Sequence, residues 1–235
     1  MLRAALIDVG GTLWPDRWPS EARHLYIENL TRNFSLSPDE VDRLLAQLEA
    51  RDPALVHPLP LVQDSSAMAA DALAGADLDH IHPMELLRAM DLPVRGVIRP
   101  FDGAEAFLRQ LKSLRIRTVI FSNATFRAAA GYRRDFDELG FGPYVDAIIS
   151  SVDIGYRKPS REIFKAALDA AGCSPSDIVV VGDSVQKDIL PALDLGMRTV
   201  LVGIEAPPPE TSHADAVVTD LDQACAVISG WTQLN

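Results

Sequence analysis

Cysteine is scarce in this sequence, and long apolar runs are missing from it. The two cysteines, Cys173 and Cys225, have neither metal-ligand nor disulfide spacing, and reduced thiols in a cytosolic protein are the simplest account of them. No apolar run approaches the ~20 residues that a membrane-spanning helix needs. Only four apolar residues stand between Arg3 and Asp8, too few for a secretory signal peptide. We therefore expect a cytoplasmic protein that does not enter a membrane.

Positive charge is also in short supply. The 235 residues include 22 lysines and arginines against 33 aspartates and glutamates, which gives a formal charge of −11. Such a surface repels nucleic acids and anionic membranes, so neither is an expected partner. Lysine itself is rare, since the chain has only Lys112, Lys158, Lys165 and Lys187. The stretch 14–98 therefore has none, which excludes any chemistry that needs a lysine there.

The stretch 14–98 lacks strand-like apolar runs as well. Its apolar residues recur at helical spacing, as at Val41, Leu44 and Leu48, which follow an N-cap sequence beginning at Ser37. We expect helices from near Ser20, from Pro38, over Leu61–Ala74 and over Pro83–Met90. The stretch is therefore predicted to be an all-helical domain inserted into the chain.

The rest of the chain alternates between short apolar runs and helical patterns. The apolar runs predict strands at 4–7, 118–121, 147–149, 178–181 and 199–202, with an edge strand at 216–218. Helices are expected over 103–114, 159–171 and 189–195. Strands that alternate with helices favour a parallel sheet with helices on both faces. We therefore predict an α/β fold with a Rossmann-like core, formed by residues 1–13 and 99–235, and the helical domain 14–98 inserted into it.

Polar side chains follow several of these apolar runs. Asp8, Ser122 and Asp183 each stand where a run ends, and Lys158 stands at the entry to a helix. The carboxyl ends of parallel strands converge on one edge of a sheet, so these side chains are expected to meet there. Carboxylates bind Mg²⁺ through oxygen, and a lysine ammonium attracts phosphate as a point charge. The pattern therefore predicts a site for a divalent metal and a phosphate.

These residues belong to four short motifs, on which the sequence resembles the haloacid dehalogenase (HAD) superfamily of aspartate-nucleophile hydrolases. The motifs occur in the family's order: Asp8-Val9-Gly10-Gly11-Thr12-Leu13, then Phe121-Ser122-Asn123, then Lys158-Pro159, then Gly182-Asp183-Ser184 followed by Asp188. Each motif lies at a predicted strand end or helix start. The resemblance covers the whole chain, and residues 14–98 take the place of the family's helical cap.

The resemblance implies a role for each motif in phosphate ester hydrolysis. Asp8 would attack phosphorus and form an aspartyl-phosphate. Lys158 would neutralise charge on Asp8 and on the phosphoryl group. Thr12, Ser122 and Asn123 would hold the phosphate of the substrate together with Lys158. The implied substrate is a small phosphorylated metabolite.

A Mg²⁺ ion is implied in the same way. Asp8, the backbone carbonyl of Gly10 and Asp183 would bind the ion, and Asp188 would complete the site by orienting the metal's waters or Lys158. Metal and lysine stabilise the charge that spreads over the transition state, which is the main contribution of a protein to phosphoryl transfer. The implied activity is therefore Mg²⁺-dependent hydrolysis.

One position departs from the family pattern. The family's phosphatases carry a second aspartate two residues after the nucleophile, which protonates the leaving oxygen and then activates water, and here that position is Gly10. The metal site survives because residue 10 would contribute its carbonyl oxygen. General acid–base catalysis, typically worth about 10²–10⁴ in rate, does not survive. We therefore expect a phosphatase that is slow unless its substrate supplies what Gly10 lacks.

Gly10 also leaves other activities open. One alternative is a family member that binds a ligand or a partner and no longer turns over. A lesser alternative is a 2-haloacid dehalogenase, although those enzymes carry Tyr at this position and work without metal; Arg17 and Arg23 would then bind halide or carboxylate. Two further branches do not fit. Phosphonoacetaldehyde hydrolases need a cap lysine, which residues 14–98 lack, and ion-pumping ATPases need a membrane span.

Overall fold

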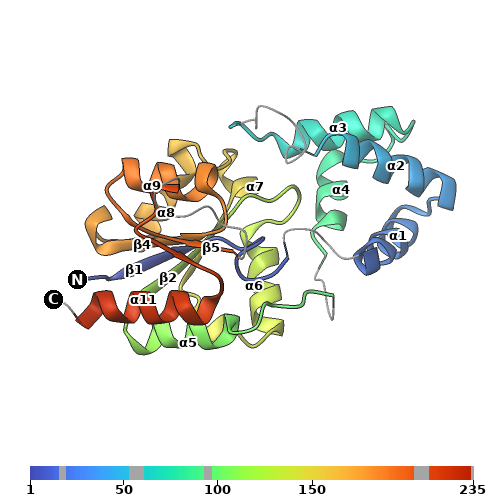
Figure 1. Cartoon of the computed structure of the whole chain (residues 1–235). Coiled ribbons are helices and arrows are strands. Elements are labelled where there is room, and N and C mark those ends of the chain that lie inside the picture. The colour runs from blue at the N-terminus through green and yellow to red at the C-terminus, as the bar shows by residue number, and fades with distance from the viewer. Residues whose placement is uncertain (16–19, 53–60, 93–96, 204–211, 234–235) are drawn as a thin grey trace.

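A single parallel sheet organises the protein (Figure 1). The computed structural model describes residues 1–15, 20–52, 61–92, 97–203 and 212–233. Within these ranges the sheet has six strands in the order β3-β2-β1-β4-β5-β6. The strands are β1 Ala4–Ile7, β2 Arg117–Ser122, β3 Ala147–Ser150, β4 Ile178–Gly182, β5 Arg198–Val202 and β6 Ala216–Val218. The predicted parallel α/β fold is confirmed, and so is the edge strand at 216–218.

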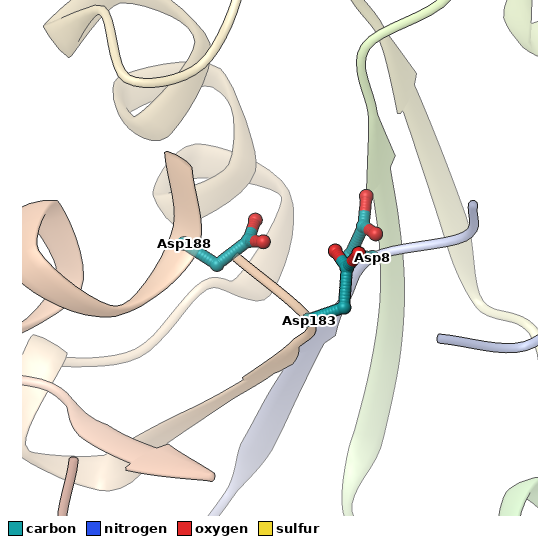
Figure 2. Close-up of side chains that lie close together, drawn as sticks. All are labelled: Asp8, Asp183 and Asp188. Atoms are coloured by element: carbon teal, nitrogen blue, oxygen red, sulfur yellow. The ribbon is translucent and has the colours of Figure 1, made fainter. Parts of the chain in front are cut away.

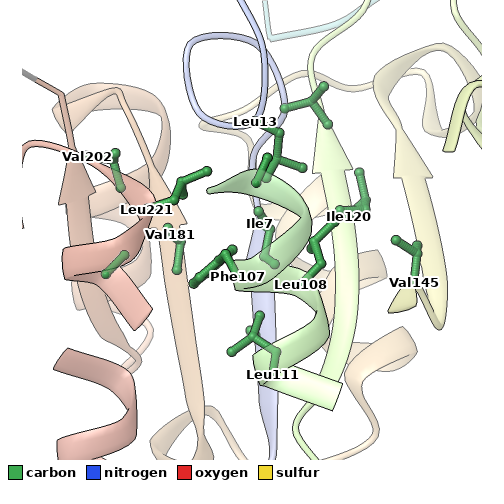
Figure 3. Packing of buried hydrophobic residues seen from close by; sticks show 14 of the residues in the cluster. Ile7, Leu13, Phe107, Leu108, Leu111, Ile120, Val145, Val181, Val202 and Leu221 are labelled. Carbon is green, nitrogen blue, oxygen red and sulfur yellow. The ribbon is translucent and has the colours of Figure 1, made fainter. Parts of the chain in front are cut away.

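Helices cover both faces of this sheet. They are α5 Ala104–Ser113, α6 Ala129–Glu138, α7 Ser151–Ile154, α8 Arg161–Ala171, α9 Leu190–Asp194 and α11 Leu221–Gln233. Successive residues of a strand point to opposite faces. Ile7 packs in the core under α5 and α11 (Figure 3), whereas Leu6 packs in the core under α8. Both residues are fully buried, as expected for a strand at the centre of a covered parallel sheet.

The stretch between β1 and α5 carries a helical insertion, by which we mean the described residues of 20–92. Its helices are α1 Ser20–Phe34, α2 Pro38–Ala50, α3 Ser65–Gly75 and α4 Pro83–Met90. These helices pack on one another around an apolar core of their own, centred on residues such as Leu44, Leu73 and Leu86 (Figure 1). Ser37 and Glu40 form a reciprocal capping box at the start of α2, as the sequence indicates. The treatment of 14–98 as a separate cap domain stays a prediction.

Three of the expected helices have different starts. The helix expected from Leu61 begins only at Ser65, because Asp64 caps it and accepts from the Ala67 amide. The helix expected from Pro159 begins at Arg161, because Ser160 serves as its N-cap. The helix expected over 189–195 is shortened to α9, and a π-helical turn over Val185–Ile189 precedes it.

Two longer helices, α6 and α11, were not expected from the sequence. The α6 segment begins without a side-chain cap and carries Gly131 within it, so the usual start signal is missing. The α11 segment is mostly apolar and follows the short strand β6 closely, which hides its helical period. None of the helices in the described ranges has the length and apolar character that crossing a bilayer requires.

Candidate active site

Asp8 lies at the carboxyl end of β1, in the middle of the sheet. Its backbone amide donates to the Val181 carbonyl of β4 at 2.9 Å, so the pairing of two strands fixes its position. The loop that follows turns back on itself, and Gly11 has a φ of 81° there, whereas Gly10 is not among the described residues with positive φ. A Cβ on Gly11 would collide with the Asp183 carboxylate. Gly11 therefore allows the loop to pass closely against Asp183.

Lys158 brings a buried positive charge to Asp8. Its ammonium donates to Asp8 Oδ1 at 2.5 Å, to Asp188 Oδ1 at 2.7 Å and to the Phe121 carbonyl at 3.2 Å. Lys158 is only 2% exposed. Burial lowers the pKa of Lys158, but the nearby carboxylates of Asp188 and Asp8 outweigh this effect and raise the pKa above its usual value. The ammonium therefore stays charged and is hydrogen-bonded to both carboxylates.

Asn123 fixes the backbone at Lys158. The Lys158 amide donates to Asn123 Oδ1 at 2.7 Å, and Asn123 Nδ2 donates to the Lys158 carbonyl at 3.1 Å. The peptide bond from Lys158 to Pro159 is cis. The side chain of Asn123 therefore joins the end of β2 to the loop that carries the ammonium, and its expected contact with phosphate stays a prediction.

Three carboxylates gather at this edge of the sheet (Figure 2). Asp8, Asp183 and Asp188 each offer an oxygen, and these oxygens lie within 4.8 Å of one another. Burial, together with the charges of Asp8 and Asp188, raises the pKa of Asp183 to about 7. Burial also raises the pKa of Asp188 to about 6, against the lowering effect of Lys158. The charges of Lys158 and Lys187 oppose these rises without cancelling them. Carboxylate oxygens are suitable ligands for Mg²⁺.

The two predicted hydroxyl groups lie at the same edge. Thr12 is fully buried and donates to Asp8 Oδ2 at 3.2 Å. Ser122 ends β2 and pairs with the hydroxyl of Tyr132 at 2.9 Å. Gly10 is half-buried and forms a β-bridge with Trp14. The structure therefore brings together Asp8, Thr12, Ser122, Lys158, Asp183 and Asp188, while their catalytic and binding roles stay predictions.

The helical insertion reaches the loops of this site through Gln63. Its amide donates to the Ala124 carbonyl at 2.8 Å, and its carbonyl oxygen accepts from Arg157 Nη1 at 2.9 Å. Nearby, Val62 forms an antiparallel bridge with Tyr156. Gln63 belongs to none of the four motifs, and its partners Ala124 and Arg157 lie just outside them, so the motifs do not indicate this contact.

A second contact joins the end of the insertion to α6. Asp91 accepts from Arg127 at 3.3 Å and from Arg134 at 3.2 Å. Gly131 leaves room for this approach, since a Cβ there would collide with Asp91. Of the arginines considered for halide binding, Arg17 lies outside the described residues, and Arg23 pairs with Asp42 and Glu49 inside the insertion, so neither supports that role.

Comparison with known proteins shows what this chain is similar to. The family described as haloacid dehalogenase-like hydrolase matches residues 2–196. The chain is 32% identical over 135 residues to glyceraldehyde 3-phosphate phosphatase of Methanothermobacter thermautotrophicus, which covers 54% of this chain and spans 58% of that protein's length. It is 30% identical over 166 residues to phosphoglycolate phosphatase of Caulobacter vibrioides, covering 67% and 68% of the two chains. The solved 2-haloacid dehalogenase of Pseudomonas syringae shares the fold, with a TM-score of 0.66 at 21% identity and coverage of 98% and 100%.

Proposed function

We infer an activity from the premise that this chain belongs to the haloacid dehalogenase-like hydrolase family. The proposal is a Mg²⁺-dependent phosphatase that acts on a small phosphorylated metabolite, with Asp8 as the nucleophile. The observation that carries it is the buried Asp8 carboxylate, held at the sheet edge by Lys158 and Thr12 and accompanied by Asp183 and Asp188. Relatives that are phosphatases by name support the same reaction class. In this reading the helical insertion is a cap domain over the site.

The first step is attack by Asp8 on phosphorus. A carboxylate is ionised at neutral pH and needs no base, so Asp8 forms the new oxygen–phosphorus bond directly. The bond to the leaving oxygen breaks, and that oxygen departs with the electron pair. Lys158 already lies against Asp8 Oδ1 and balances charge as the phosphoryl group arrives. The product of this step is an aspartyl-phosphate on Asp8.

The second step is hydrolysis of the aspartyl-phosphate. Water attacks phosphorus, the bond to Asp8 breaks, and phosphate leaves while the Asp8 carboxylate is regenerated. The proton of the attacking water goes to solvent, because Gly10 has no side chain that can take it. Lys158 remains beside Asp8 through both steps and keeps its own proton, because its pKa is raised.

The acidic cluster is suited to hold the ion. Asp8, Asp183 and Asp188, with the carbonyl of Gly10, would hold Mg²⁺, since three carboxylates and one ammonium leave uncompensated negative charge. When bound, the ion supplies electrostatic stabilisation for the phosphoryl oxygens. Burial, with repulsion among the carboxylates, raises the pKa values of Asp183 and Asp188, and a bound cation would offset that repulsion.

The missing acid narrows the substrate class. Without a side chain to protonate it, the leaving oxygen must depart as an anion or take a proton from water. Acyl phosphates, phosphoric anhydrides and aryl phosphates release such anions more easily than sugar phosphates do. We therefore expect the rate to fall steeply as the pKa of the leaving group rises. A flat dependence, with chemistry shown to be rate-limiting, contradicts this substrate class.

Hydrolysis of an aryl phosphate with Mg²⁺ and with a chelator tests the proposal. Turnover is expected with Mg²⁺ and is lost on chelation. Thermal melts give a readout that does not depend on activity, since Mg²⁺ at one hundred times its Kd adds about 2.7 kcal/mol to the free energy of unfolding. A folded protein that neither melts later with Mg²⁺ nor hydrolyses aryl or acyl phosphates under any divalent metal contradicts the proposal.

Gly10 favours one second candidate, a protein that binds a phosphorylated ligand without turnover. Lys158 can attract phosphate without any side chain at position 10. Acid–base catalysis, in contrast, requires a side chain there that Gly10 does not have. This candidate predicts phosphate binding with Mg²⁺ and no hydrolysis. Release of chloride from 2-chloropropionate without metal would instead indicate the dehalogenase reaction.

A further inference from the structure

Tyr132 belongs to none of the motifs, yet it contacts the candidate site directly. It lies on α6, and its hydroxyl is 2.9 Å from Ser122 Oγ. Tyr132 is 8% exposed and Ser122 2%, so the pair is shielded from water. We propose that Tyr132 is a positioning residue, which donates its hydroxyl hydrogen to Ser122 and thereby leaves the Ser122 hydrogen free for a substrate phosphate. This proposal rests on the proposed function and adds the group that orients one of its phosphate ligands.

The direction of the hydrogen bond follows from the burial of the phenol. A buried phenol keeps its hydrogen, because burial raises the pKa of Tyr132 to about 12. That hydrogen needs an acceptor, since buried polar groups in folded proteins are nearly always satisfied. Among the residues that the structure describes, Ser122 Oγ is the hydrogen-bond partner of this hydroxyl. Tyr132 therefore donates, and Ser122 accepts.

This direction decides what Ser122 can offer to a ligand. A serine hydroxyl has one hydrogen and two lone pairs, so accepting from Tyr132 leaves its hydrogen available. The internal acceptor for that hydrogen is the Asn123 carbonyl at 3.4 Å, which is a long contact. A phosphoryl oxygen carries negative charge, and hydrogen bonds to charged acceptors are about twice as strong as neutral ones. Ser122 can exchange the weak contact for phosphate without losing the bond from Tyr132.

Aromatic packing holds the Tyr132 ring in place. Its centroid lies 6.5 Å from that of Trp14, and Trp14 lies 5.2 Å from Phe136 on the same helix. Trp14 ends the loop that begins at Asp8, and its amide donates back to the Val9 carbonyl. The aromatic group thus ties α6 to the nucleophile loop. Tyr132 fixes Ser122 relative to Asp8 as well as orienting its hydrogen.

The test measures binding of inorganic phosphate by calorimetry in the presence of Mg²⁺, a readout that does not require turnover. Tyr132→Phe keeps the ring and removes the hydroxyl, and we expect its Kd for phosphate to rise about three- to tenfold. Ser122→Ala is expected to raise Kd by at least as much. The double variant is expected to bind no more weakly than Ser122→Ala alone, because Tyr132 acts through Ser122. A general loss of packing would instead add to the effect of Ser122→Ala.

Tyr144→Phe is the matched control, since Tyr144 is a half-buried tyrosine that packs against the same core away from the site. Its Kd is expected to equal that of the unchanged protein, and melting curves confirm that every variant is folded. If the unchanged protein binds phosphate and Tyr132→Phe binds it equally well, or if the two single effects add, the role of Tyr132 is overturned while the phosphatase proposal stands. If the unchanged protein neither binds phosphate nor hydrolyses an aryl phosphate, the proposed function fails first and the role of Tyr132 fails with it.

Discussion

The sheet edge and the helical insertion meet at the same loops, but different forces place them there. At the sheet edge, strand pairing positions Asp8, which follows β1, and Ser122, which ends β2, because backbone hydrogen bonds fix the register of both strands. The insertion reaches the site through a short backbone bridge between Val62 and Tyr156 and through the side chain of Gln63 on the Ala124 carbonyl. Asp91 contacts Arg127 at its other end. The edge is therefore set by the order of the strands, whereas the insertion contacts depend on where two loops meet and on individual side chains. Topology can be inferred from a sequence far more readily than single contacts can.

The largest expected effect is that of Asp8→Asn at the sheet edge, which should change activity but not stability. Asp8→Asn removes the nucleophile, and we expect turnover to fall by ~10⁴-fold or more. The melting temperature should not fall in proportion, because the substitution removes one negative charge from a cluster of three carboxylates that repel one another. Initial rates with an aryl phosphate and melting curves measure the two effects on the same samples.

Asp169→Asn serves as the control for this prediction. Asp169 is exposed and pairs with Lys165 on the surface of α8, so its loss should leave both rate and melting temperature close to those of the unchanged protein. If Asp8→Asn retains turnover, the nucleophile has been assigned wrongly.

The fold and most of the candidate site follow from the sequence for a physical reason. Apolar runs of strand length alternate with helical patterns, which restricts the chain to a parallel sheet, and parallel strands bring their carboxyl ends together. Asp8, Ser122 and Asp183 therefore converge whatever their surroundings. The motif resemblance added Asp188, which lies on a π-helical turn that no apolar pattern predicts.

The rest of the site was hidden because it depends on loop paths and on α6. Tyr132 lies on a helix without a side-chain cap, so neither the helix nor the contact was expected. Gln63 falls in a segment expected to be helical, whereas in the structure its backbone amide donates to the Gly155 carbonyl. Asn123 was expected to bind phosphate, whereas in the structure its side-chain amide hydrogen-bonds to the backbone of Lys158. Such contacts depend on where two distant loops come to lie.

The second prediction concerns Gly10, which stands where the family's phosphatases carry the aspartate for acid–base catalysis. Gly10→Asp restores a carboxylate two residues after Asp8, and we expect it to speed dephosphorylation of the aspartyl-phosphate by about 10²-fold. The unchanged protein should show a burst followed by slow turnover, because Asp8 attacks unaided while water lacks a base. Rapid-quench kinetics with an aryl phosphate resolve the two phases.

The neighbouring glycine supplies a matched contrast. Gly10 is not among the described residues with positive φ, so an aspartate there meets no left-handed backbone. Gly11 has a φ of 81° and lies against Asp183, so Gly11→Ala should distort the loop and reduce activity and stability. A folded, Mg²⁺-binding Gly10→Asp that is no faster in single turnover would show that acid–base catalysis does not limit this protein.

The third prediction tests the insertion's own connection to the site. Gln63→Leu removes a buried amide that joins the Ala124 carbonyl to Arg157, and we expect the free energy of unfolding to fall by about 1–3 kcal/mol. Gln223→Leu is the control, because Gln223 makes comparable hydrogen bonds at an exposed position. Urea unfolding of both variants measures the difference. If both variants lose the same free energy of unfolding, the buried hydrogen bonds of Gln63 contribute no more to stability than exposed ones, and the prediction is wrong.

The smallest expected effect concerns two carboxylates, Asp146 and Asp91, that both lie beside cations. The pKa of one is lowered in the folded protein, and the pKa of the other is raised. Asp146, at the start of β3, accepts from Lys112 and from the Thr118 amide, and these bonds outweigh burial and lower its pKa. Asp91, at the end of the insertion, is more deeply buried, and burial outweighs Arg127 and Arg134 and raises its pKa. The ionised form of Asp146 is therefore favoured by folding, and the ionised form of Asp91 is disfavoured.

The two shifts predict opposite pH dependences for the matched variants Asp146→Asn and Asp91→Asn. A lowered pKa gives stability that is present above the unfolded-state value, near 4, and is lost as pH falls through the folded-state value. The deficit of Asp146→Asn relative to the unchanged protein should therefore grow as pH rises toward the unfolded-state pKa, about 4, and level off above it. A raised pKa gives stability that is present below the unfolded-state value and is lost as pH rises through the folded-state value, so Asp91→Asn should improve relative to the unchanged protein as pH rises above about 4. Urea unfolding at several pH values gives both slopes, and slopes of the same sign would show that the ion pairs of Asp91, and not its burial, govern how the insertion is held against α6.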